Sequence, residues 1–231
     1  MRRDVDGCAV IEFEGVGHTY DTNPVVSDVD MKLDERRVAF VGANGSGKST
    51  VARMINGLVV PTRGRVRVDG LDTATEGRKV RKHVGFVFTN PDSQIVMPTA
   101  GEDVAFSLRG SGLSKKDRAA RAAEVLAEYD LDPEHPAHQL SGGQKQLLAL
   151  CSMLVLDPDV LVCDEPTTLL DLRNKRRFID LLAQLRQQVV LVTHDLDLLD
   201  GFERVLVFDE GRVVADDEPA TAVRYYRGLV S

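Results

Sequence analysis

The chain has 231 residues, of which 43% are hydrophobic, so it can bury one large core. Its formal net charge of -7 argues against broad binding to a nucleic-acid backbone, which needs a basic surface. No apolar run reaches the length of a membrane-spanning helix and no signal-like segment follows the charged start, so we expect a cytosolic protein that meets a membrane only through partners.

Strands and helices are expected to alternate along the chain. Residues 10–14 and 25–33 alternate apolar and polar side chains, as half-exposed antiparallel strands do. Continuous apolar runs, typical of a buried parallel sheet, occur at residues 37–41, 84–88, 160–163 and 189–192. Helices are expected at residues 51–56, 76–82, 114–129, 172–186 and from 219 onward, with a strand at 65–68 and a closing hairpin at 204–215.

Residues 100–156 differ from the rest because they show helical periodicity and few β-branched runs. We therefore expect an α-helical subdomain inserted into a core made of residues 1–99 and 157–231. The fold class is predicted to be α/β, with an N-terminal antiparallel β layer. The three cysteines have no paired spacing, which predicts buried, reduced thiols.

A glycine-rich segment fits the pattern G-x-x-x-x-G-K-[ST] without a mismatch. Its residues are Gly42, Ala43, Asn44, Gly45, Ser46, Gly47, Lys48, Ser49 and Thr50. Glycines let successive backbone N–H groups turn toward an anion, and the helix that follows adds its positive end. We expect this loop to bind the phosphates of a nucleotide, with Lys48 on the outer phosphates and Ser49 on Mg²⁺.

An acidic pair, Asp164 and Glu165, ends one of the apolar strands, where parallel sheets place ligand-facing residues. Asp164 is suited to the Mg²⁺ shell opposite Ser49. Glu165 can orient or deprotonate a water for attack on the γ-phosphate, so it is a candidate catalytic residue. The alternative is a solvated acidic turn.

Residues 140–144 read Leu-Ser-Gly-Gly-Gln at the start of an apolar helix. Ser is a good N-cap, so an ordinary helix cap is one interpretation. The N–H groups of the helix start also form a second anion site. Two phosphate sites in one chain suggest that two chains meet head to tail, each donating its second site to the other's nucleotide.

The order of these motifs, followed by Val192-Thr193-His194, resembles the ATP-binding subunit of an ATP-binding cassette (ABC) transporter. The resemblance implies an α/β fold with a P-loop NTPase core of the RecA-like type. The resemblance implies that His194 contacts the γ-phosphate and the attacking water, and that Asp171 lies in the loop linking the two sites of a dimer. Tyr20 matches the aromatic residue that stacks on adenine, although a surface aromatic in a turn is the alternative. The residues implied to clamp the partner's ATP are Ser141, Gly142, Gly143 and Gln144.

Residues 87–94, with 101–106 and 112–114, resemble more narrowly the ATPases of energy-coupling factor transporters, which import vitamins and metal ions. This implies partners of two kinds, a transmembrane scaffold (T) component and a substrate-binding (S) component, on the cytoplasmic face of the membrane. Exposed apolar residues at 95–97 suit a groove for the scaffold, although ordinary core is the alternative. The resemblance places Pro91, Asp92 and Gln94 in that groove.

Thr89 stands where the family usually has Gln, which helps to bind Mg²⁺ and water. A Thr hydroxyl can contact a metal but reaches less far, so we expect slower or more loosely coupled hydrolysis. The short end after the last helix resembles the dedicated biotin transporters, in which one ATPase pairs with itself. A cobalt or nickel importer, and a dimer with a paralogous ATPase, are the alternatives within the family.

Two alternative functions lie outside transport. An ATP-driven factor on ribosomes or DNA usually has two cassettes or a coiled-coil insertion, and this sequence has neither. A switch that binds ATP without hydrolysing it is disfavoured by Glu165 and His194.

Overall fold

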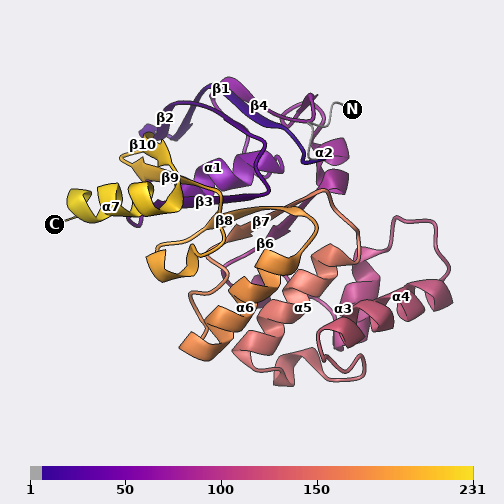
Figure 1. Cartoon of the computed structure of the whole chain (residues 1–231). Coiled ribbons are helices and arrows are strands. Elements are labelled where there is room, and N and C mark those ends of the chain that lie inside the picture. The colour runs from indigo at the N-terminus through magenta and orange to yellow at the C-terminus, as the bar shows by residue number, and fades with distance from the viewer. Residues whose placement is uncertain (1–6, 231) are drawn as a thin grey trace.

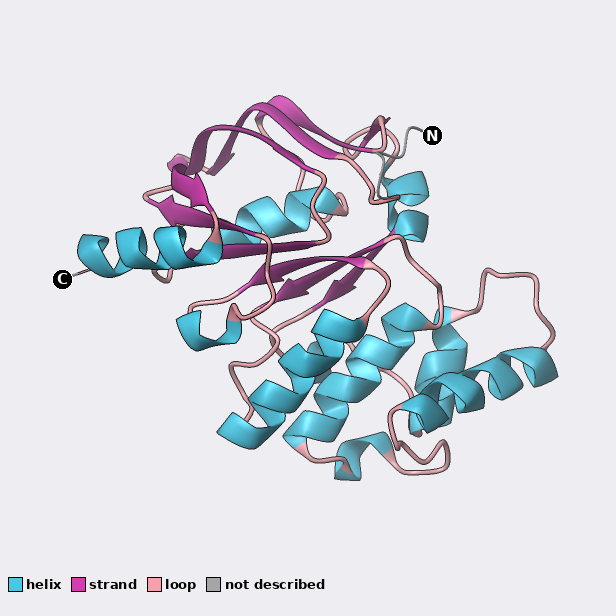
Figure 2. Cartoon of the chain, viewed as in Figure 1, coloured by secondary structure: helices cyan, strands magenta, loops and turns pink. Residues whose placement is uncertain are grey.

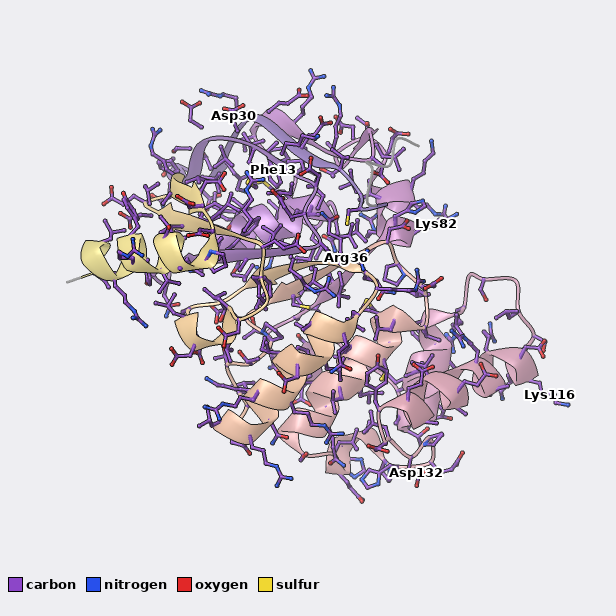
Figure 3. The ribbon with its side chains drawn as sticks, in the orientation of Figure 1. Phe13, Asp30, Arg36, Lys82, Lys116 and Asp132 are labelled. Atoms are coloured by element: carbon purple, nitrogen blue, oxygen red, sulfur yellow. The ribbon has the colours of Figure 1, made fainter. Side chains whose placement is uncertain are left out.

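In the computed structural model, which describes residues 7–230, an antiparallel sheet forms one outer layer (Figure 1). Its strands are β1 (Ile11–Tyr20), β2 (Asn23–Leu33), β4 (Arg63–Val68) and β5 (Leu71–Asp72). The strand order is β2-β1-β4-β5, and all pairs are antiparallel. Figure 3 shows Phe13 on the inner side of this sheet, where it is buried, and Asp30 on the outer side, where it is exposed. The predicted N-terminal β layer is therefore confirmed.

A second sheet of six strands forms the centre of the molecule (Figure 2). Its strands are β3 (Arg37–Gly42), β6 (Val84–Val87), β7 (Val160–Asp164), β8 (Gln188–Val192), β9 (Arg204–Asp209) and β10 (Arg212–Asp217). The order is β10-β9-β3-β8-β7-β6, with β10 antiparallel and the others parallel. Every residue of β3, β6, β7 and β8 is buried, because both faces of this sheet are covered.

Helices cover both faces of the central sheet (Figures 1 and 2). Helix α1 (Lys48–Ile55) lies between the two sheets and shares their apolar core. A second core forms where other helices pack on the opposite face. The remaining helices are α2 (Gly77–His83), α3 (Ala100–Ser107), α4 (Lys115–Glu128), α5 (Gly142–Leu154), α6 (Leu172–Gln184) and α7 (Pro219–Leu229), with short 3-10 turns η1 (Pro91–Ser93), η2 (Ala137–Gln139) and η3 (Leu196–Leu198).

Most predicted elements are present, and their ends differ for local reasons. Helix α4 begins where Ser114 accepts a hydrogen bond from the Asp117 amide, as its capping sequence predicts. Helix α1 starts at Lys48 rather than at the predicted residue 51, because the last residues of the glycine-rich loop already form its first turn. Within residues 7–230, no helix combines the length and apolar character needed to cross a bilayer.

All three cysteines are buried and free, as expected for buried, reduced thiols. Burial raises the pKa of Cys151 to about 12 and also raises that of Cys163. A thiol that stays protonated is a poor nucleophile and a poor metal ligand. Cys151 and Cys163 therefore serve as small apolar core residues.

Candidate active site

The glycine-rich loop joins the end of β3 to the start of α1. Gly42, Gly45 and Gly47 have φ angles of 148°, 83° and 95°, a region that favours glycine. A Cβ on Gly42 would lie 2.2 Å from the Phe208 carbonyl oxygen, so the neighbouring strand β9 also excludes a side chain there. The first N–H groups of α1 meet no side-chain cap at Gly47. The loop and helix therefore offer backbone donors to an anion.

Lys48 is folded back onto the loop that contains it. Its Nζ donates to the carbonyl oxygens of Gly42 at 2.9 Å and Ala43 at 2.7 Å, and the residue is only 4% exposed. Burial lowers the pKa of Lys48, and the Glu165 and Asp164 carboxylates oppose that shift. The amine is thus held in the loop without a salt-bridge partner among residues 7–230, where a phosphate would supply the missing charge.

The carboxylate of Asp164 connects β7 to α1. It is 1% exposed, and both of its oxygens accept hydrogen bonds. Ser49 Oγ donates to Oδ1 at 2.6 Å, and Arg53 Nη2 donates to Oδ2 at 3.0 Å. Hydroxyl and carboxylate oxygens are the ligands that Mg²⁺ prefers, so the pair formed by Ser49 and Asp164 fits this ion.

Glu165 follows Asp164, and the backbone at Glu165 is strained. Its φ of 51° is in the left-handed region, which is uncommon for a residue with a long side chain. Its amide donates to the Val192 carbonyl at 3.0 Å, which ties the turn to β8. The side chain is fixed as well, since His194 Nδ1 lies 2.6 Å from Oε2 and Thr168 Oγ1 donates to the same oxygen at 3.0 Å.

Lys48, Ser49, Glu165 and His194 line one cavity of about 300 Å³. Thr89 also lines it, and its hydroxyl donates to the Asp164 carbonyl at 2.8 Å. The cavity therefore joins a phosphate-type loop, a cationic amine, the Ser49 hydroxyl and a fixed carboxylate, and the Asp164 carboxylate is bonded to Ser49 without lining the cavity itself. The lining consists of Val25, Asn44, Gly45, Gly47, Lys48, Ser49, Thr50, Thr89, Glu165, Thr168 and His194.

The second predicted phosphate site lies at the start of α5. Ser141 Oγ accepts from the Gln144 amide, and Gln144 Oε1 accepts from the Ser141 amide at 2.9 Å, so the two form a capping box. The start of α5 thus has the geometry of an ordinary helix cap, and its role as an anion site stays a prediction. Asp171 caps α6 in a similar way, by accepting from the Asn174 amide at 2.8 Å. Neither Ser141 nor Asp171 is among the residues that line the cavity.

The segment predicted to face a membrane partner is partly turned inward. Pro91 is buried, and Gln94 bridges the Phe88 amide at 3.3 Å and the Ala149 carbonyl at 3.2 Å. Asp92 stays exposed and pairs with Lys145 of α5 at 2.7 Å. Pro91 and Gln94 therefore fix the segment, and its exposed surface comes from other residues.

Tyr20 lies at the end of β1 and is 44% exposed. Tyr20 is not among the residues that line the cavity, so its contact with adenine stays a prediction.

Sequence reasoning missed Arg53, Thr168 and Lys145. A signal existed for two of them. Arg53 follows Ser49 by four residues on a helix, which places both on one face, and Thr168 follows Glu165 by three residues in a turn. Lys145 carried no such signal, because its partner Asp92 comes from a distant part of the chain.

Comparisons with known proteins agree with this geometry. The family model described as ABC transporter matches residues 26–168, more than half of the chain. An ABC transporter ATP-binding protein of Deinococcus radiodurans, for which no substrate is named, is 53% identical over 94% of this chain and 97% of its own length. The biotin transport ATP-binding protein BioM of Rhizobium etli is 44% identical over 96% of this chain and 99% of its own.

A solved structure gives the same result for the fold. The protein cbiO1 of Clostridium perfringens, part of the ABC transporter complex cbiONQ, superposes with a TM-score of 0.81. It is 28% identical, and the match covers 95% of this chain and 92% of that protein. The predicted α/β fold with a P-loop core is therefore confirmed. The chain belongs to the ATP-binding proteins of ABC transporters and is an ATPase.

Proposed function

We propose that this chain is the ATP-hydrolysing subunit of an energy-coupling factor importer, with biotin as the favoured cargo. The observation that carries the hydrolytic role is the fixed carboxylate of Glu165 in the same cavity as the phosphate loop. The importer type is supported by the motif resemblance and by the similarity to BioM and cbiO1. The match to BioM also favours biotin over cobalt or nickel.

The chemistry follows from what each side chain can do. The N–H groups of the loop and the amine of Lys48 bind the phosphates and neutralise their charge. Ser49 and Asp164 hold Mg²⁺, which when bound adds charge stabilisation on the phosphate oxygens. Thr89 lines the same cavity, but its hydroxyl is already engaged by the Asp164 carbonyl.

Glu165 acts on the attacking water. Two donors hold its Oε2, so we assign Oε1 as the oxygen that accepts a proton from the water. The water oxygen bonds to the γ-phosphorus as the bond to the bridging oxygen breaks, which releases ADP and phosphate. His194 fixes the carboxylate and contacts the γ-phosphate.

A complete site requires a second copy of the chain. The N-terminus of α5 offers backbone donors to an anion but lies outside the cavity of its own chain. We infer a head-to-tail homodimer, in which residues 141–144 and Asp171 of one chain face the nucleotide of the other. A paralogous ATPase could fill the second position in the same way.

The membrane partner docks beside residues 91–97. Val96 is 62% exposed, and a groove of about 530 Å³ beside it is lined in part by Met97, Phe106 and Arg109. Apolar side chains such as Val96 and Phe106, beside charged ones such as Arg109, suit an amphipathic helix of the transmembrane scaffold (T) component, which in turn binds the substrate-binding (S) component. The chain is then peripheral on the cytoplasmic face of the membrane.

Glu165→Gln tests the hydrolytic role. The variant keeps the size of the side chain but cannot accept the proton, so we expect phosphate release to fall at least about a hundredfold while ATP still binds. Phosphate release is measured beside ATP binding, with Glu210→Gln as the control, because Glu210 lies in the hairpin after β9 and outside the cavity. Normal turnover by Glu165→Gln would remove the assigned role.

The cargo is tested on the intact complex. The tagged chain is purified from native membranes in detergent, and the complex is titrated with biotin, Co²⁺ and Ni²⁺. We expect biotin to bind and the metal ions not to bind. Binding of either metal ion without biotin would contradict the biotin assignment but leave the hydrolytic role intact.

A further inference from the structure

His18 is a buried polar residue that the chemistry above does not use. It lies on β1 and is 8% exposed. Neither ring nitrogen has a hydrogen-bond partner within residues 7–230. A neutral imidazole always carries one N–H group, so leaving that donor unpaired in the core costs stability. An apolar ring would fill the same space without this cost.

The ring of His18 packs against Tyr20. Their centroids are 4.5 Å apart and their planes make an angle of 84°, the edge-to-face arrangement that aromatic pairs prefer. The two residues are two positions apart on one strand and so share a face of the sheet. His18 is buried whereas Tyr20 is 44% exposed, because the strand runs past the edge of the core. The buried His18 ring thus packs against the exposed Tyr20 ring and restricts its position.

The end of β1 is also attached to the phosphate loop. Tyr20 pairs with Asn23 across a turn, and His18 pairs with Val26. Val25, between these paired positions, lines the cavity. Its carbonyl oxygen would lie 2.8 Å from a Cβ placed on Gly47. The hairpin that carries Tyr20 therefore packs directly on the loop that receives the phosphates.

We propose that His18 is a positioning residue, which holds the Tyr20 ring in place to stack on the adenine of ATP. This inference rests on the proposed ATPase function and on the base-stacking role that the family resemblance implies for Tyr20. His18 contributes to recognition of the base and not to recognition of the phosphates, because its contact is with the exposed ring and the phosphates bind to the loop and α1.

The experiment compares a ligand that has a base with one that has none. ATP and inorganic tripolyphosphate, each with Mg²⁺, are titrated calorimetrically in the Glu165→Gln background, which prevents turnover. We expect Tyr20→Ala and His18→Ala both to weaken ATP binding, His18→Ala by about two- to tenfold, the size expected for an edge-to-face pair. Tripolyphosphate should bind all variants equally. His18→Phe should restore ATP binding, since it keeps the ring edge against Tyr20.

Each other result overturns the inference in a distinguishable way. Unchanged ATP binding by His18→Ala, with Tyr20→Ala weakened, would show that His18 does not position the ring while Tyr20 still stacks. Equal weakening of ATP and tripolyphosphate binding by His18→Ala would show a general structural defect. Failure of His18→Phe to restore ATP binding would show that the ring edge is not what holds Tyr20. Unchanged ATP binding by Tyr20→Ala would remove the proposed stacking role itself.

Discussion

Arg53 is the counter-charge for a buried carboxylate, and Arg53→Met tests how much that pairing contributes. Asp164 is 1% exposed, with one oxygen bonded to Ser49 and the other to Arg53. Removing one partner of a buried ion pair costs about 3–5 kcal/mol, because a charge is left uncompensated. The Arg53 side chain is 40% exposed, so solvent screens part of the interaction. We therefore expect a loss of about 1–3 kcal/mol.

The assay is urea unfolding without nucleotide or Mg²⁺, with Arg121→Met as the matched control. Arg121 pairs with Glu124 at 3.0 Å on α4, but both side chains are exposed, so its loss should cost less than about 0.5 kcal/mol. In the Asp164→Asn background, Arg53→Met should also cost less than about 0.5 kcal/mol, because a neutral amide needs no counter-charge. An equal cost in both backgrounds, or a cost no larger than that of the control, would refute this reasoning.

Two further predictions concern turnover and pH. Thr89→Gln should raise both basal and transport-coupled phosphate release. The Thr89 hydroxyl is bonded to the Asp164 carbonyl, whereas the longer amide of Gln would reach further into the cavity. Unchanged rates of phosphate release would contradict this prediction. Burial raises the pKa of the Cys151 thiol to about 12 in the folded chain, above the ordinary thiol pKa that applies in the unfolded chain. The protonated thiol therefore contributes its full stability below the ordinary thiol pKa, and this contribution is lost as the pH rises toward 12. The free energy of unfolding should therefore fall above about pH 9, and less steeply in Cys151→Ala. The native thiol should also resist a disulfide reagent at pH 8, and rapid labelling would argue against its burial.

Local patterns predicted the centre of the site. The residues of the phosphate loop are consecutive, so their spacing alone specifies a tight turn and a helix start. Asp164 and Glu165 could be placed because a buried strand precedes them and parallel strands end at a common edge. The order of the strands β3, β8 and β7 then brings these groups together.

Contacts between distant segments could not be predicted. The pair Asp92 with Lys145 depends on how α5 lies against the segment before α3, which no local pattern encodes. The pair Arg53 with Asp164 was signalled only indirectly, by the four-residue spacing of Arg53 from Ser49. The inward orientation of Gln94 depends in the same way on the packing of α5. The edge-to-face contact of His18 with Tyr20 was likewise not predicted, because the first strand was expected to end at residue 14, whereas β1 continues to Tyr20.

The sharing of ATP between two chains is tested most directly by the mass of the Glu165→Gln variant in solution. Light scattering after gel filtration should show a monomer without nucleotide and a dimer with MgATP, because the variant binds ATP without consuming it. Ser141→Arg in the same background should bind ATP but stay monomeric, since the bulky cation blocks the second phosphate site at the start of α5. A Glu165→Gln chain that stays monomeric at saturating MgATP, or a Ser141→Arg variant that dimerises equally well, would contradict the shared site.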